Sequence, residues 1–351
     1  MRAEREARVI AAIREWFYQG RLLKSVELPA FTISVGNLSM GGTGKSPFVM
    51  LLARLSLAEG KRTAVITRGY KRKSSNLELV AADAKLPPVG ALGDEPWMIK
   101  NRLPGIALLV HRDRARMALR HWKDLGTPEL LILDDGFQHW QAVRDRDVLM
   151  VDVSESLDQL TIPFGRMRES TAAVGRADLI VLTRAKAIAP EKLAKIEKRL
   201  RGLMDVRRQP LWKRSRTSKL RILKADYEFK EFFDGATGLA CPLPEGQEFV
   251  LASGIAKPDG VRALARSLNV PVREEIYFSD HHRLSGAEIT RLRKAVEQLP
   301  GGALLVTEKD WARWRDTLAG IPMIGMRVEF QFLGDGEAQV KEFLLEAPCF
   351  T

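Results

Sequence analysis

The sequence predicts an α/β protein with a doubly wound, mainly parallel sheet and a second, smaller α/β domain. Three observations lead to this class. Short apolar runs typical of buried strands alternate with helical patterns, the alternation continues over most of the chain, and it resumes after a basic, extended stretch at 209–223. The chain has 351 residues, which is long enough for two hydrophobic cores.

The first expected element is an amphipathic helix over residues 1–24. Its apolar face is formed by Val9, Ile10, Ile13, Trp16 and Phe17. Arginines occupy the rest of the helix: Arg5, Arg8, Arg14 and Arg21. Two interpretations stay open at this point, a basic helix lying on an anionic membrane surface and a helix packed on its own domain.

The main domain is expected over residues 25–208. Strands are predicted at 31–36, 62–69, 105–111, 129–136, 145–153 and 177–183, and helices at 45–60, 114–126 and 190–204. In doubly wound sheets ligands bind at the carboxyl ends of the strands, where the motifs described below are located.

A linker or hairpin is expected at 209–235, and the smaller α/β domain at 236–351. Its predicted strands lie within 248–255, 273–282, 302–310 and 323–333, with helices at 259–269 and from Ser285 onward.

Composition limits the partners and the compartment. Lys and Arg number 56 against 44 Asp and Glu, a net charge of +12 that suits an anionic partner such as nucleic acid, acidic lipid or a phosphorylated substrate. The two cysteines, Cys241 and Cys349, match no disulfide or metal pattern, which favours a reducing cytoplasm. The sequence shows neither a signal peptide nor an apolar run of roughly 18 residues.

The stretch SVGNLSMGGTGKSPF, residues 34–48, has the pattern of a phosphate-binding loop between a strand and a helix. Its first glycine is replaced by Ser39, but the glycines that free the backbone to face phosphate oxygens are present. Lys45 would reach the β- and γ-phosphates, and the Ser46 hydroxyl would bind Mg²⁺. The predicted nucleotide-binding residues are Ser39, Met40, Gly41, Gly42, Thr43, Gly44, Lys45, Ser46 and Pro47. The alternative is a glycine-rich turn with an exposed lysine.

A second motif, LLILDD at 130–135, is a buried strand that ends in two carboxylates. Many strands end in Asp, but after a phosphate-binding loop this pattern favours a Mg²⁺ site. The predicted metal ligands are Ser46, Asp134 and Asp135. Guanine-recognition spacing is absent, because LTRAK at 182–186 lacks the aspartate and VTEKD at 306–310 has the wrong spacing. Adenine is therefore favoured, and the fold class becomes that of the P-loop NTPases.

Two further motifs carry titratable side chains. Asp94 in GDEPWM precedes a helical pattern, where it could be a catalytic carboxylate or only a helix N-cap. FSDHH at 278–282 contains adjacent histidines, of which only one is expected to enter a given site. A structural or exposed role for these histidines stays open, and zinc is not expected because no further ligands lie nearby.

In order, GNLSMGGTGKSP, TRGYKR, GDEPWM, LDDGFQH, PFGRMRES and FSDHH closely resemble the tetraacyldisaccharide 4'-kinase family. The resemblance extends from the phosphate-binding loop to about residue 310. It implies transfer of the γ-phosphoryl of ATP, with Mg²⁺, to the 4'-hydroxyl of an acylated glucosamine disaccharide 1-phosphate. It also implies a peripheral protein on the cytoplasmic face of the bacterial inner membrane, held by the N-terminal helix.

The resemblance also assigns roles to residues. Asp94 would accept the acceptor proton with support from His281, or from His282 if the pair is aligned otherwise, and Lys45 would act on the phosphates. The residues that would line the substrate site are Thr67, Arg68, Glu95, Arg114, His139, Arg168 and Glu169. An acceptor base from the first domain and a histidine from the second predict domain closure over ATP.

Two other classes remain as competing hypotheses. A membrane-associated ATPase of the partition or sorting class would need neither Asp94 nor the adjacent histidines, although such loops usually carry Lys where this chain has Met40. A nucleic-acid-stimulated NTPase would explain the charge, but the basic residues are dispersed without interleaved aromatics. We therefore expect no nucleic-acid partner, and no obligatory protein partner is evident.

Overall fold

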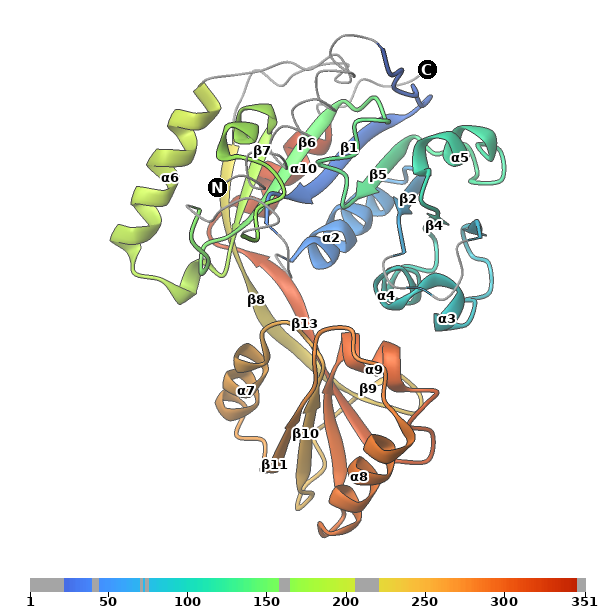
Figure 1. Ribbon diagram of the computed structural model, residues 1–351, viewed down its shortest axis with the longest axis vertical. Coiled ribbons are helices and arrows are strands. Elements are labelled where there is room, and N and C mark those ends of the chain that lie inside the picture. The colour runs from blue at the N-terminus through green and yellow to red at the C-terminus, as the bar shows by residue number, and fades with distance from the viewer. Residues whose placement is uncertain are drawn as a thin grey trace.

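The computed structural model describes residues 22–39, 44–69, 72, 76–157, 165–205 and 221–345. Two domains lie one above the other, joined by two long strands, as Figure 1 shows. The predicted helix at 1–24 lies almost entirely outside the described residues. So do the loop residues Met40, Gly41, Gly42 and Thr43.

The first domain holds a sheet of mostly parallel strands. Its strands are β1 (Phe31–Asn37), β2 (Thr63–Thr67), β3 (Glu78–Val80), β4 (Ala107–Val110), β5 (Leu130–Asp134), β6 (Arg146–Asp152) and β7 (Leu179–Thr183). Its helices are α2 (Lys45–Ala58), α3 (Val89–Leu92), α4 (Asp94–Arg102), α5 (Arg114–Arg120), η1 (Thr171–Arg176), η2 (Ala185–Ala187) and α6 (Pro190–Asp205). The strand order is β7-β6-β1-β5-β2-β4-β3, with only β3 antiparallel to its neighbour.

The second domain continues the same sheet. The remaining elements of the described chain are β8 (Arg221–Asp234), β9 (Ala240–Cys241), β10 (Phe249–Ser253), α7 (Pro258–Ser267), β11 (Val272–Tyr277), α8 (Gly286–Glu297), β12 (Ala303–Thr307), α9 (Glu308–Trp314), β13 (Met323–Phe332) and α10 (Gly336–Leu345). The order β11-β10-β12-β13-β8 joins the first sheet where β8 pairs with β7.

The strand β8 belongs to both domains. Its first residues pair in parallel with β7, and the rest pairs antiparallel with β13 from Ala225 to Asp234. The expected linker or hairpin at 209–235 therefore contains a continuous strand over 221–234, in which buried and partly exposed residues alternate only from Arg221 to Ala225.

The end of the chain returns to the first domain. Helix α10 packs with α2, β8 and β13, and its residue Phe343 is fully buried. Phe48 of α2 packs edge-on against Phe330 and Phe332 of β13, with ring centroids 5.5 and 6.3 Å apart. Residues from about 330 onward thus pack with the first domain, whereas 236–351 was expected to form the second.

Both faces of the first sheet are covered, which explains its continuous apolar strands. Ile33, Val35 and Ile132 pack with α2 on one face. Leu131 and Leu133 pack with α5 on the other, and the same face of β6 and β7 packs with α6. The strand alternation directs successive residues to opposite faces, so the polar residues that follow the strands gather at the carboxyl edge.

Candidate active site

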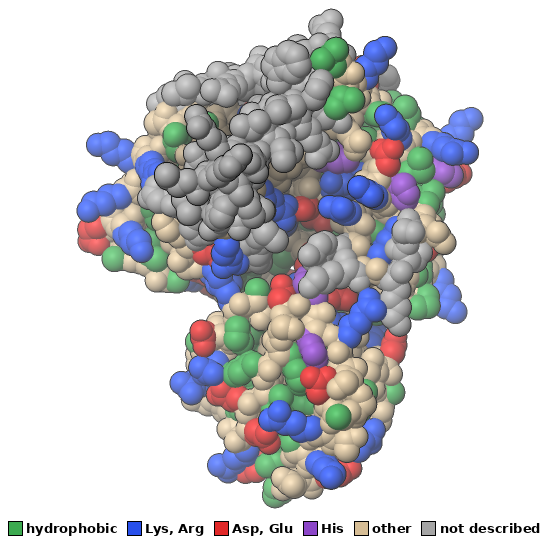
Figure 2. Space-filling view, in the orientation of Figure 1, with side chains coloured by type: hydrophobic (Ala, Val, Ile, Leu, Met, Phe, Trp, Pro, Cys, Tyr) green, Lys and Arg blue, Asp and Glu red, His purple; other side chains and the backbone are tan. Residues whose placement is uncertain are grey.

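A cavity of about 1940 Å³ lies between the two domains at the carboxyl edge of the first sheet. Figure 2 shows acidic, histidine and basic side chains meeting where the molecule narrows between its domains, while other Lys and Arg are dispersed over the surface. Both domains line the cavity, so its residues come from segments far apart in the chain.

The phosphate-binding loop enters helix α2 through a left-handed residue. Gly44 has φ of 83°, a conformation that glycine adopts without strain, and Lys45 begins the helix. A Cβ on Gly44 would lie 1.4 Å from the hydroxyl of Tyr227 on β8, so this position has no room for a side chain. Ser39 precedes the loop and forms an isolated bridge with Met167.

Lys45 is held by two first-domain side chains. Its Nζ donates to Asn37 Oδ1 at 3.1 Å and lies 3.1 Å from Asp135 Oδ1. Arg168 donates to both carboxylate oxygens of Asp135, at 2.8 and 2.9 Å. Burial alone would raise the pKa of Asp135, but Lys45 and Arg168 outweigh it and hold that pKa well below its usual range.

Asp134 is a buried carboxylate with one oxygen unused. Thr67 donates to its Oδ2 at 2.8 Å, and Oδ1 has no hydrogen-bond partner among the described residues. Burial, followed by the charges of Glu95 and Asp135, raises the pKa of Asp134 to about 6. A cation beside Oδ1 would stabilise the ionised carboxylate of Asp134 and so lower this pKa.

These residues fit a magnesium ion bound together with a nucleotide. Ser46 Oγ and the unpartnered oxygen of Asp134 are oxygen ligands of the kind Mg²⁺ prefers, and Mg²⁺ usually takes only one or two protein carboxylates. Accordingly, no group of three or more His, Cys, Asp or Glu in the described part of the chain forms a metal cluster of its own.

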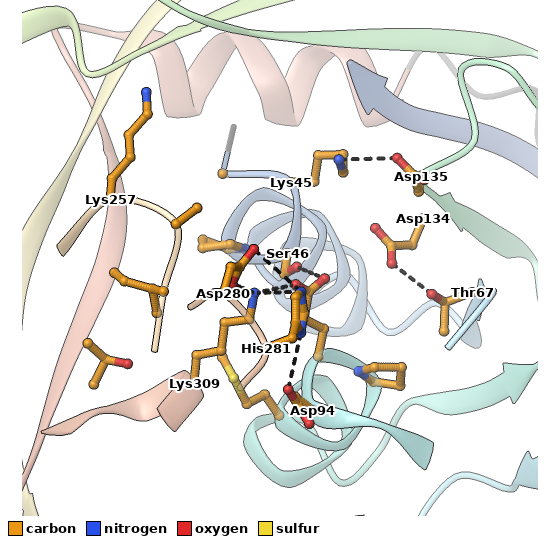
Figure 3. Close-up of a pocket in the computed structure, with 18 of the residues that line it drawn as sticks. Lys45, Ser46, Thr67, Asp94, Asp134, Asp135, Lys257, Asp280, His281 and Lys309 are labelled. Carbon is orange, nitrogen blue, oxygen red and sulfur yellow. Dashed lines mark hydrogen bonds and ion pairs between the residues drawn. The ribbon is translucent and has the colours of Figure 1, made fainter. Parts of the chain in front are cut away.

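Asp94 opens helix α4 and receives two donors from the second domain. Its Oδ2 lies 3.3 Å from His281 Nδ1 (Figure 3) and 2.7 Å from Arg313 Nε. Burial would raise the pKa of Asp94, but the hydrogen bond from His281 and the charge of Arg313 outweigh it and lower that pKa to about 2. Asp94 is therefore a carboxylate that bridges the domains.

The two histidines separate at a turn after β11. His281 has φ of 60° and faces Asp94, whereas His282 lies 2.9 Å from Glu288 and stacks on Phe278. Only one enters the site, as predicted, but a tight turn rather than strand alternation separates them. Glu288 also completes a capping box with Ser285 at the start of α8.

Glu95 connects the Asp94 end of the cavity to the phosphate-binding loop. Ser46 Oγ donates to Glu95 Oε2 at 3.0 Å, and Lys309 Nζ lies 2.9 Å from Glu95 Oε1. The positive charge of Lys309 lowers the pKa of Glu95 to about 2 against the effect of burial.

The other residues expected in the substrate site fall into two groups. Arg68 and His139 line the cavity, as do Thr67 and Arg168. Arg114 also lines it, but its guanidinium donates to the backbone carbonyls of Asp134 and Asp135 and so supports the end of β5.

Glu169 lies outside the cavity lining. Its carboxylate receives two hydrogen bonds from Arg176, at 2.8 and 3.0 Å, and Arg176 lies over the Phe137 ring. The pair is buried, so Glu169 balances an internal charge next to the site instead of facing the cavity.

Comparison with known proteins agrees with this geometry. The family model described as tetraacyldisaccharide-1-P 4'-kinase matches residues 5–348. The chain belongs to the tetraacyldisaccharide 4'-kinase family. This confirms the family resemblance seen in the sequence motifs and shows that the protein is an enzyme, a kinase with a hydroxyl acceptor.

Relatives named tetraacyldisaccharide 4'-kinase are about one third identical to this chain over the aligned residues. The protein from Anaeromyxobacter sp. (strain K) is 32% identical over 93% of this chain and 83% of its own length. That of Halothermothrix orenii is 33% identical over 86% and 79%. The structure of LpxK from Aquifex aeolicus in complex with ATP superposes with a TM-score of 0.74 at 26% identity, covering 98% of this chain and 96% of that one. The predicted fold class is thereby confirmed.

Four residues of this kinase site were not singled out from the sequence. Asn37 and Asp280 lie within the motifs GNLSMGGTGKSP and FSDHH, but Lys309 and Arg313 come from α9, which was not predicted as a helix. The only sequence signal for Lys309 was its place in VTEKD at 306–310, a stretch whose spacing does not match guanine recognition.

Among the described residues of this 4'-kinase family member, the structure has no helix with the length and apolar character of a membrane span.

Proposed function

We propose that this protein transfers the γ-phosphoryl group of ATP to the 4'-hydroxyl of tetraacyldisaccharide 1-phosphate, giving lipid IVA in lipid A biosynthesis. The observation that carries the proposal is the junction at Glu95, where the phosphate-binding end of the cavity meets the Asp94–His281 pair. Family membership and the ATP complex of the Aquifex aeolicus relative support the substrates.

The proposed reaction forms a bond between the acceptor oxygen and the γ-phosphorus. The bond from that phosphorus to the β–γ bridging oxygen breaks, and ADP leaves with the electron pair. Lys45 and the start of α2 bind the phosphates, while Ser46 and Asp134, with Asp135 beside them, would hold Mg²⁺. When bound there, Mg²⁺ would neutralise part of the negative charge of the phosphates.

The acceptor proton passes to the pair formed by Asp94 and His281. With its pKa near 2, Asp94 is ionised at neutral pH, so it orients the imidazole and stabilises the charge that the imidazole gains. Asp94 comes from α4 of the first domain and His281 from the turn after β11 in the second. Closure of the two domains over ATP therefore assembles the pair.

A transfer assay tests this function. Labelled ATP, Mg²⁺ and the disaccharide 1-phosphate are incubated with the protein in detergent, and label on the lipid is the expected result. Label in free phosphate alone would contradict the proposal and favour an ATPase of the partition or sorting class.

Variants of the acceptor pair test the mechanism. Asp94→Ala and His281→Ala should each lower kcat by about 10²–10⁴-fold while ATP still binds. His282→Ala is the matched control, because its ring faces Glu288 and should leave kcat near that of wild type. If Asp94→Ala and His281→Ala both remained within a few-fold of wild type, the pair would have no part in proton transfer.

The proposal extends to the membrane surface. A substrate with four acyl chains stays in the bilayer, so the basic helix at 1–24 is proposed to rest on anionic phospholipid of the inner membrane's cytoplasmic face. Replacing Arg5, Arg8, Arg14 and Arg21 by Gln should weaken binding to phosphatidylglycerol vesicles by about 1 kcal/mol per arginine.

The control for vesicle binding is a variant with the same change of charge elsewhere. Arg62, Arg116, Arg266 and Arg291 are exposed arginines of the described chain and can be replaced together by Gln. Equal loss of vesicle binding in both variants would mean that net charge, and not the N-terminal helix, attracts the membrane.

A further inference from the structure

Helix α9 faces the first turn of α4 across the domain boundary. Asp94 and Glu95 are consecutive at the start of α4, and Lys309 and Arg313 are one helical turn apart on α9. Arg313 contacts Asp94, and Lys309 contacts Glu95. One short helix thus brings two cations to two adjacent carboxylates of the other domain.

The two cations differ in how firmly they are held. The Arg313 side chain is 5% exposed. Its Nε contacts Asp94, and its NH1 donates to the Gly254 carbonyl at 3.0 Å and to Asp310 at 3.3 Å. Lys309 is 23% exposed and lines the cavity, with carboxylates at 2.9 Å (Glu95) and 3.6 Å (Asp280).

The ammonium of Lys309 lies between the two functional ends of the site (Figure 3). Its Nζ is 3.3 Å from His281 Nε2, and Glu95 joins it to the Ser46 hydroxyl at the start of α2. The region between these groups is where the proposed function requires the transferring phosphoryl. Burial lowers the pKa of Lys309, but Glu95 and Asp280 outweigh it, so the ammonium stays charged.

We propose that Lys309 is a catalytic residue whose ammonium contacts the transferring phosphoryl group, exchanging the Glu95 carboxylate for a γ-phosphate oxygen. This inference rests on the proposed function. Lys309 remains protonated throughout, and the acceptor proton goes to the Asp94–His281 pair. The lysine belongs to the second domain, so its charge reaches the phosphoryl only when the domains are closed.

The physical basis is the charge that spreads over the transferring group in the transition state. A cation supplied from a separate element stabilises this charge and lowers the barrier. Lys45 approaches the phosphates from the first domain, where it lies against Asp135, and Lys257 lies against Asp152 at another side of the cavity. Lys309 is the cation placed beside both Glu95 and His281.

The alternative is that Lys309 only holds the domains together through Glu95. Affinities for ATP and ADP, measured by calorimetry with Mg²⁺, separate the two roles because ADP lacks the γ-phosphate. For Lys309→Gln we expect ATP to bind about tenfold more weakly and ADP almost as in wild type. Retained ADP binding also shows that the variant is folded.

Kinetics and a matched variant complete the test. Single-turnover phosphoryl transfer should fall by about 10³-fold in Lys309→Gln and recover in part in Lys309→Arg. Lys230→Gln removes a second-domain lysine that pairs with Glu329 away from the cavity, and it should leave the ratio of ATP to ADP affinity unchanged. Equal weakening of ATP and ADP in Lys309→Gln, or transfer within a few-fold of wild type, would overturn the proposal. Absence of transfer in the wild type would instead refute the proposed function.

Discussion

Arg313 Nε lies 2.7 Å from Asp94 Oδ2, the same oxygen that His281 Nδ1 approaches at 3.3 Å. Arg313 is itself fixed by Asp310, which is fully buried and accepts hydrogen bonds from Ser253, Thr307 and the Gly254 amide. The pKa of Asp94 is therefore lowered by an arginine that a buried hydrogen-bond network of the second domain holds in place.

We predict that removing Arg313 changes the pH dependence of catalysis. His281 and Arg313 are the side chains that lower the pKa of Asp94 to about 2, so Arg313→Met should raise that pKa, since burial then has less opposition. The acid limb of the kcat/KM profile should move to higher pH. Arg313→Lys keeps the charge and should shift the limb less.

The same linkage affects stability. Because the pKa of Asp94 is lower in the folded state than its ordinary value of 3.8, its contribution is present above about pH 4 and is lost as pH falls toward 2. Unfolding of wild type and Arg313→Met at pH 7 and pH 3 measures this contribution. If the acid limb of the kcat/KM profile did not move in Arg313→Met, Arg313 would not control the pKa of Asp94.

A second prediction concerns Gly44, whose φ is positive and whose missing side chain leaves room for Tyr227. Gly44→Ala adds left-handed strain and a clash with the Tyr227 hydroxyl, so ATP affinity and stability should both fall. Gly60→Ala is the control, because Gly60 also has positive φ but no atom within 4 Å of an added Cβ. The excess destabilisation of Gly44→Ala should be about 1–3 kcal/mol. Equal effects would mean that Tyr227 does not constrain the loop.

A third prediction separates Glu169 from its neighbour Arg168. Glu169→Gln removes the carboxylate that accepts two hydrogen bonds from the buried Arg176, and the free energy of unfolding should fall by about 3–5 kcal/mol. Arg168→Gln removes a cation from Asp135 at the cavity, so it should lower ATP affinity or kcat with a smaller stability cost. Denaturant titration and steady-state kinetics of both variants check this. A stable Glu169→Gln that loses transfer would restore the substrate role expected from the sequence.

The sequence predicted most of the parallel strands, because apolar runs locate them. It also singled out Lys45, Asp94 and Asp134, which lie at the start of α2, the start of α4 and the end of β5 and line one cavity. It did not predict which second-domain residues contact these first-domain residues, because such contacts form only in the folded chain. Arg313 meets Asp94 across 219 residues, and no local periodicity encodes that approach. The strand β8 begins within the basic stretch at 209–223 and alternates only in its first residues, so it was expected as part of a linker or hairpin.

The last prediction concerns the other end of the domain boundary, where Lys257 of the second domain reaches first-domain residues. Its Nζ lies 2.7 Å from Asp152 Oδ2 and 3.1 Å from Glu155 Oε1, at the end of β6. The strands β8 and β13 are the covalent connections between the domains. Loss of the Lys257 contact should therefore let the two domains move apart. Small-angle scattering of Lys257→Ala without nucleotide should show a larger radius of gyration. Arg262→Ala breaks an ion pair with Glu275 inside the second domain and should leave the radius unchanged. Equal radii for Lys257→Ala and wild type would mean that the contacts between α4 and α9 suffice to hold the domains closed.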